Sequence, residues 1–124
     1  NQIGLNPIIF HKSINQSRTI IQKLKDLSDV NFAIILLSGD DYGYAKYLDD
    51  NKRMLRARQN VIFEMGYFLA KIGSKKTFIL FNSKENFEFP SDLSGVLYEP
   101  LDELDQWKVK LIKELEINGF TIEK

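Results

Sequence analysis

Glu64 is the residue whose position in this sequence most directly suggests chemistry. It lies in RARQNVIFEMGYFLAKIG, residues 56–73, whose apolar spacing predicts a helix made for burial. Between Val61 and Ala70 the only ionisable side chains are Glu64 and Tyr67. A carboxylate in such surroundings meets water poorly, and it could act as an acid, a base or a stabiliser of positive charge. A simpler interpretation is a glutamate at the rim of the core, paired with a neighbouring Arg or Lys.

The helix around Glu64 has two distinct faces. Asn60, Glu64, Tyr67 and Lys71 follow one another at i, i+4, i+7 and i+11 and therefore share one face. The apolar stripe consists of Val61, Met65, Phe68, Leu69 and Ile72. Glu64 is thus expected at the edge of the buried stripe, where a ligand could reach it.

Charged residues between the apolar run 31–38 and the helix are further candidates. Asp40 and Asp41 directly follow the apolar run and could hold ribose hydroxyls, a metal ion or an arginine, or could simply form a turn. Arg53, Arg56 and Arg58 form a basic cluster before the helix. These arginines could clamp a diphosphate or pair with the two aspartates, and the sequence favours neither.

Arg18 opens another expected helix after a polar segment. It could face a phosphate, but a solvated charge is the simpler interpretation. The chain has no cysteine and a single histidine, His11. Disulfides, thiolate nucleophiles, multi-histidine metal sites and a Ser-His-Asp triad are therefore not expected. GxGxxG and GxxxxGK[ST] are absent, which removes the dinucleotide fingerprint and the phosphate loop.

Size and composition indicate one ordinary globular domain. The chain has 124 residues, 44% of them hydrophobic and 27% charged, and its formal net charge is zero. That balance argues against direct nucleic-acid binding, which favours a basic excess. No apolar run approaches the ~20 residues of a membrane span, and no signal peptide is visible. A cytoplasmic protein without membrane contacts is expected.

Strands and helices are expected to alternate along the chain. Apolar runs predict strands at 7–10, 31–38, 76–81 and 95–100. Helices are expected at 17–27, 58–72 and 102–118, and a long loop with a helical turn at 39–53. This alternation predicts an α/β fold with a mostly parallel, doubly wound sheet. Ligands bind such sheets beyond the carboxyl ends of the strands.

The first residues, NQIGLNP, resemble the end of a helix, with Gly4 in the C′ position. A segment upstream is therefore expected to have been left out, which makes 1–124 an N-terminally truncated domain. A strand absent with it would be the central one, so the sheet of this chain should contain a gap. A response-regulator receiver is a poor match, because Ser38 and Gly39 stand where its acceptor aspartate belongs.

Several segments together resemble a bacterial TIR-like family. They are FAIILLSGDD, RARQNVIFEMGYFLAKIG, FPSDLSGVLYEPLDE and, after Trp107, LIKELEINGF. Members have been called predicted nucleotide-binding proteins with a TIR-like domain, and they include TIR–STING anti-phage effectors. The resemblance covers nearly the whole chain and implies a flavodoxin-like TIR fold. The family's first strand and its HGHD-like segment are absent here.

The resemblance implies an NAD⁺ hydrolase that cleaves the bond between nicotinamide and ribose. The family's essential glutamate falls on Glu64, and Asp40, Arg56 and Asn60 fit the lining of the pocket by position. Tyr67 and Arg18 complete the expected substrate-binding set. NAD⁺ would be the substrate, and neither a cofactor nor a metal is expected.

The resemblance also implies partners. Residues His11 to Ser17 match a loop that gates the pocket and contacts a neighbouring protomer. Activation by oligomerisation and a fused or associated cyclic-nucleotide sensor are therefore expected. Two alternatives remain: a non-enzymatic TIR module that binds nucleotide or a partner protein, and a nucleoside deoxyribosyltransferase-like enzyme.

Overall fold

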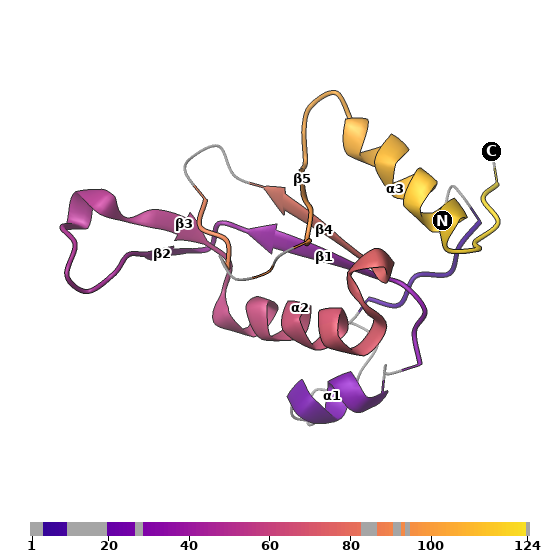
Figure 1. Cartoon of the computed structure of the whole chain (residues 1–124), viewed down its shortest axis with the longest axis horizontal. Coiled ribbons are helices and arrows are strands. Elements are labelled where there is room, and N and C mark those ends of the chain that lie inside the picture. Colours follow the sequence, from indigo (N-terminus) through magenta and orange to yellow (C-terminus); the bar gives the residue numbers. More distant parts are fainter. Residues whose placement is uncertain are drawn as a thin grey trace.

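The fold is built on a parallel sheet, seen in a computed structural model (Figure 1). The structure describes residues 4–9, 20–26, 29–82, 87–90, 93 and 95–123. Within them, β1 (Ala33–Ser38), β4 (Thr77–Asn82) and β5 (Tyr98–Pro100) form the sheet, in the order β1-β4-β5. All pairs are parallel, and β1 aligns with β4 from Ala33↔Thr77 to Ser38↔Asn82.

Helix α2 (Gln59–Ile72) connects β1 to β4 and covers one face of the sheet. Its apolar side packs on the inward residues of the strands, and the most deeply buried side chains are Leu24, Leu37, Met65 and Ile79. Leu24 comes from α1 (Ile20–Asp26), whose backbone oxygen at this residue accepts a 3.3 Å hydrogen bond from the Tyr67 hydroxyl. Helix α1 is thereby attached to α2.

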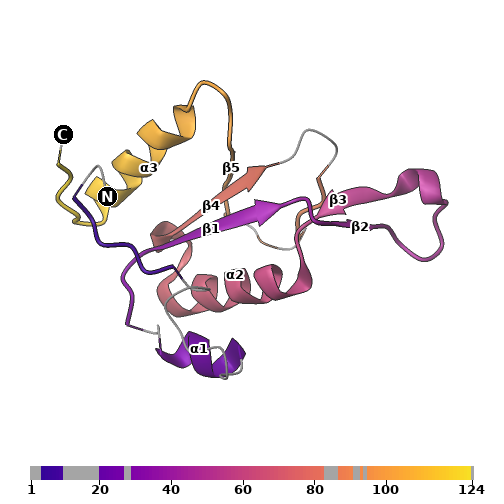
Figure 2. The ribbon, with the colours of Figure 1, turned by 180° about the vertical axis from the view of Figure 1, so that it is seen from behind.

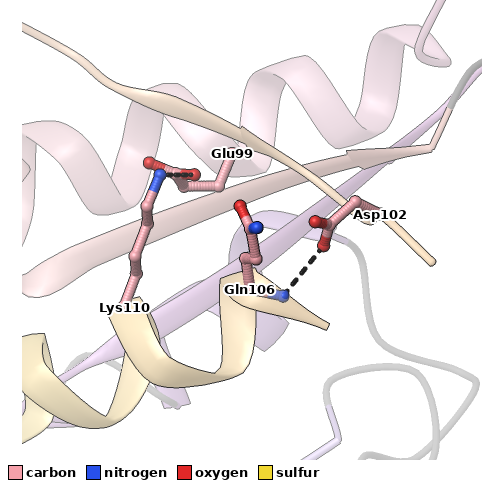
Figure 3. Close-up of polar contacts among 4 residues, drawn as sticks. All are labelled: Glu99, Asp102, Gln106 and Lys110. Atoms are coloured by element: carbon pink, nitrogen blue, oxygen red, sulfur yellow. Dashed lines mark hydrogen bonds and ion pairs between the residues drawn. The ribbon is translucent and has the colours of Figure 1, made fainter. Parts of the chain in front are cut away.

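Helix α3 (Gln106–Ile117) lies on the other side of the sheet, as the two opposite views show (Figures 1 and 2). An ion pair of 2.9 Å joins Lys110 Nζ to Glu99 Oε2 of β5 (Figure 3). The first backbone N–H of the helix, at Gln106, donates to Asp102 Oδ1 over 3.1 Å. Asp105, just before the helix, has a φ of 54°. These contacts fix where α3 starts relative to β5.

The long loop expected at 39–53 is a hairpin, which corrects the prediction. Strands β2 (Asp41–Gly43) and β3 (Met54–Arg56) pair antiparallel, and η1 (Asp50–Lys52) lies at the tip. The hairpin projects away from the sheet beyond the carboxyl ends of β1 and β4 (Figure 1). Its base is held by the Glu88 N–H, which donates to the Leu55 oxygen over 2.7 Å.

The strand expected at 7–10 is not formed over Pro7–Ile9, and Phe10 lies outside the described residues. Strands need hydrogen-bonded neighbours, and no strand of the described ranges lies on the outer edge of β1. Ile34 and Leu36 on that strand are 51% and 50% exposed. Within the described residues β1 is therefore an edge strand, and Pro7–Ile9 has no strand to pair with.

The remaining predicted elements are confirmed within a few residues. Helix 17–27 corresponds to α1 over its described part, and 58–72 and 102–118 correspond to α2 and α3. Gly73 ends α2 at a φ of 89°, with its N–H bonded to the Leu69 oxygen, as expected of a C-terminal glycine. A short helical turn, η2 (Ser74–Lys76), leads into β4. In the described ranges, no helix is both long and apolar enough to cross a bilayer.

Candidate functional site

Glu64 lines a cavity that runs along β1, from Val30 and Phe32 before the strand to Ser38 and Asp40 at its carboxyl end. Its side chain is only 8% exposed, yet it lines a space of about 470 Å³. Val61, Glu64 and Phe68 face this space from one side of α2, as their spacing of three and four residues requires. Ser38, Asp40 and Arg58 line it as well. Most of the other lining is apolar, from β1 and from residues 8 and 9.

A tight turn brings Asp40 to this cavity. The Asp40 N–H donates to the Ser38 oxygen over 2.8 Å, so the chain turns directly after β1. Gly39 allows the turn to pass close to β3, since a β-carbon at this position would lie 3.1 Å from Leu55 Cδ1. The Asp40 carboxylate then meets the Arg58 guanidinium, with Oδ2 and Nε 3.4 Å apart.

A second, more polar cavity of about 600 Å³ adjoins the first. Asp40 and Arg58 line both cavities, and Asp41, Arg56 and Asn60 are among the residues of the second. Arg56 crosses the hairpin with its guanidinium against Gly43, where any side chain would collide with it. Its NH1 lies 3.6 Å from Glu88 Oε1.

The structure separates the expected binding residues into groups. Asp40 shares a cavity with Glu64, whereas Arg56 and Asn60 line the neighbouring one. Tyr67 is directed to α1 through its bond to Leu24, and it lines neither cavity. Arg18 and the loop at 11–17 lie outside the described residues. Ser38 was not predicted; its position at the end of a buried strand, before a turn, was the available signal.

The cavity position bears on how Glu64 is used. Arg56 and Arg58, two basic neighbours of Glu64 in the sequence, form ion pairs with Glu88 and Asp40. A buried carboxylate beside a largely apolar cavity can stabilise a positive charge that forms inside it. Among the described residues, no group of three or more His, Cys, Asp or Glu side chains is arranged to hold a metal ion.

A parallel sheet with helices on both sides (Figure 1), and with polar residues gathered at the carboxyl end of β1, defines a doubly wound α/β domain. Residues 1–103 match the family described as "CAP12/Pycsar effector protein, TIR domain", and the chain belongs to this family.

Three relatives are similar to the chain in sequence. YuaY of Escherichia coli (strain K12) is 46% identical over the whole chain, which spans 40% of YuaY. Protein tirC of Dictyostelium discoideum is 34% identical over 84% of the chain and 57% of tirC. Pycsar effector protein BcPycTIR of Burkholderia cepacia is 30% identical over 61% of the chain, and the match spans 24% of BcPycTIR. The chain therefore spans less than two thirds of each of these relatives.

Proposed function

We propose that this domain is an NAD⁺ hydrolase that cleaves the bond between nicotinamide and ribose. The observation that carries the proposal is Glu64, a glutamate 8% exposed that lines a cavity along β1 together with Ser38, Asp40 and Arg58. The resemblance to TIR enzymes places the essential glutamate at this position.

The main requirement of this reaction is that the protein stabilises the positive charge that forms on the ribose. When the C1′–N bond breaks, its electron pair leaves with the nicotinamide nitrogen, which becomes neutral and needs little help from an acid. Positive charge develops on the ribose, as it does in glycoside cleavage. The Glu64 carboxylate stabilises this charge in a cavity that excludes most water. A water molecule then bonds to C1′, loses its proton and gives nicotinamide and ADP-ribose; attack by a group of the same molecule would give a cyclic product.

The other lining residues have supporting roles in this proposal. The Asp40 carboxylate and the Ser38 hydroxyl are placed to accept hydrogen bonds from ribose hydroxyls. Arg56 and Asn60, in the adjoining cavity, contact the remainder of the dinucleotide. The substrate-binding roles expected for Tyr67 and Arg18 stay predictions. For Tyr67, the hydrogen bond to the Leu24 oxygen favours a structural role that joins α2 to α1.

We further propose that assembly switches the enzyme on in anti-phage defence. Relatives carry the name Pycsar effector protein, and this chain matches only a part of them. A cyclic-nucleotide sensor, fused or associated, would then report infection and bring TIR domains together.

The experiment is NAD⁺ consumption by the intact protein, assembled by its activating signal or by a fused oligomeric scaffold. Glu64→Gln is expected to lower the rate on the order of 10³-fold, because the charge that opposes the ribose cation is lost. Glu116→Gln, an exposed glutamate of α3, is the matched control and should retain the rate. Equal rates for wild type and Glu64→Gln would refute the assignment.

Two further outcomes separate the alternatives. Binding of ADP-ribose without any NAD⁺ loss in the assembled state would identify a non-enzymatic module. Exchange of one nucleobase for another on a deoxyribose, with NAD⁺ untouched, would identify a deoxyribosyltransferase-like enzyme.

A further inference from the structure

The pair formed by Asp40 and Arg58 stands between two cavities. Both residues line the largely apolar cavity of Glu64, of about 470 Å³, and also the polar cavity of about 600 Å³ next to it. A molecule that occupies both cavities must therefore pass this pair. Such a molecule would have one end that fits the largely apolar cavity and a more polar end that fits the polar cavity.

Arg58 differs from the other two arginines of the basic cluster. Arg53 places its guanidinium 4.5 Å from the centre of the Tyr42 ring. Arg56 pairs with Glu88, at 3.6 Å, and lines only the polar cavity of the two. Arg58 is the member of the cluster that lines the Glu64 cavity, so it is the one that can meet a ligand held by Glu64.

The bond between Arg58 and Asp40 is easily exchanged. The side chains of Arg58 and Asp40 are 63% and 45% exposed, and Nε and Oδ2 are 3.4 Å apart. Ion pairs this exposed contribute little to stability. A diphosphate offers more charge and can accept two parallel N–H bonds from a guanidinium. A bound diphosphate can therefore replace Asp40 as the partner of Arg58.

The spacing along α2 suits a dinucleotide. Arg58 precedes the first turn of the helix and Glu64 follows six positions later, so their α-carbons are about 9 Å apart along the axis. In NAD⁺ the cleaved bond and the diphosphate are separated by one ribose and one methylene group. The flexible side chain of Arg58 can make up the difference between the α-carbon separation and the distance from the cleaved bond to the diphosphate.

We infer that Arg58 recognises the diphosphate of the substrate, with Asp40 holding the guanidinium in place while the site is empty. The pair then makes the enzyme specific for dinucleotides over nucleosides that carry the same nicotinamide–ribose bond. This inference rests on the proposed NAD⁺ hydrolase function and names what its site selects.

The test compares three substrates with the same cleaved bond in the intact, assembled protein: NAD⁺, nicotinamide mononucleotide and nicotinamide riboside. Arg58→Ala is expected to lower kcat/KM for NAD⁺ by about 10-fold to 100-fold, mainly through KM, because a charge-assisted hydrogen bond is lost. Turnover of the riboside, which has no phosphate, should stay unchanged. Arg58→Lys should restore part of the loss, and Lys71→Ala, on the same helix, controls for the loss of one positive charge.

Each result decides the inference. An equal loss for NAD⁺ and the riboside, or no loss for either, would overturn a phosphate-binding role while the hydrolase proposal stands. If wild type cleaves none of the three, the hydrolase proposal fails, and calorimetry with ADP-ribose then decides. Weaker ADP-ribose binding by Arg58→Ala supports phosphate recognition in a non-enzymatic domain, and equal binding or none at all overturns it.

Discussion

Burial disfavours a charged carboxylate, so the surroundings of a buried carboxylate must compensate for the loss of water. Glu64 lies on the same turn of α2 as Met65, which is 1% exposed, and a leucine or methionine at position 64 would bury more apolar surface. The cavity at its side explains the acid in functional terms, because a ligand can reach the carboxylate where bulk water does so only in part. At this scale the site depends on one carboxylate and on the turn that brings Asp40 beside it.

Tyr98 gives a prediction about stability at the residue scale. Its hydroxyl is buried against an aromatic cluster and has no hydrogen-bond partner among the described residues. An unpaired buried polar group is unfavourable, so Tyr98→Phe is expected to raise the free energy of unfolding by about 1 kcal/mol at pH 7. Urea unfolding measures this change. A loss of stability would show that the hydroxyl makes a bond that the fold needs.

The same residue predicts a pH dependence. Burial raises the pKa of Tyr98 above its usual value of 10.0, because desolvation disfavours the phenolate. The unfolded chain therefore ionises first, and the stability linked to this group is complete below pH 10 and is lost as pH rises further. Wild type should lose stability more steeply than Tyr98→Phe as the pH rises above 10, as measured by unfolding at each pH. Parallel curves would contradict the burial.

At the scale of elements, α3 depends on how its first turn is held. Asp102 accepts a hydrogen bond from the Gln106 N–H, one of the amides that the helix itself leaves unpaired. Asp102→Ala should lower the free energy of unfolding by about 1 kcal/mol, as losses of helix-capping side chains do. Glu103→Ala, at the neighbouring exposed residue, is the control and should change stability little. Equal losses in the two variants would show that the bond is not the cause.

The elements also show what sequence patterns can and cannot predict. The strand at 31–38 was predicted because it is a continuous, β-branched apolar run, and the helix at 58–72 because its apolar periodicity reflects burial against a sheet. The hairpin of β2 and β3 was missed because each strand has three residues, too few for alternation to be visible, and their pairing depends on closing the chain around η1. The residues of the site were likewise predicted in part. Glu64 was visible as an anomaly in an apolar pattern, whereas the pairing of Arg58 with Asp40 is set by the turn at Gly39.

At the scale of the whole molecule, the dominant feature is the outer edge of β1, where none of the described residues forms a pairing strand. Parallel sheets are normally covered on both faces and paired along their central strands, yet Ile34 and Leu36 are half exposed. Unpaired strand edges are places where another chain can add. In the polypeptide 1–124 this edge therefore favours self-association, separately from the assembly proposed for activation.

Two neighbouring leucines of β1 test this view. In the polypeptide 1–124, Leu36→Lys should cost less than about 1 kcal/mol, because residue 36 is half exposed, and it should reduce self-association measured by light scattering. Leu37, at 0% exposure, is the matched control, and Leu37→Lys should cost about 3 kcal/mol or more because it buries an unpaired charge. If Leu36→Lys is as damaging as Leu37→Lys, another segment or a second copy covers this face of β1. Leu36 also lines the Glu64 cavity, so the segment or second copy that covers this face would partly close the cavity.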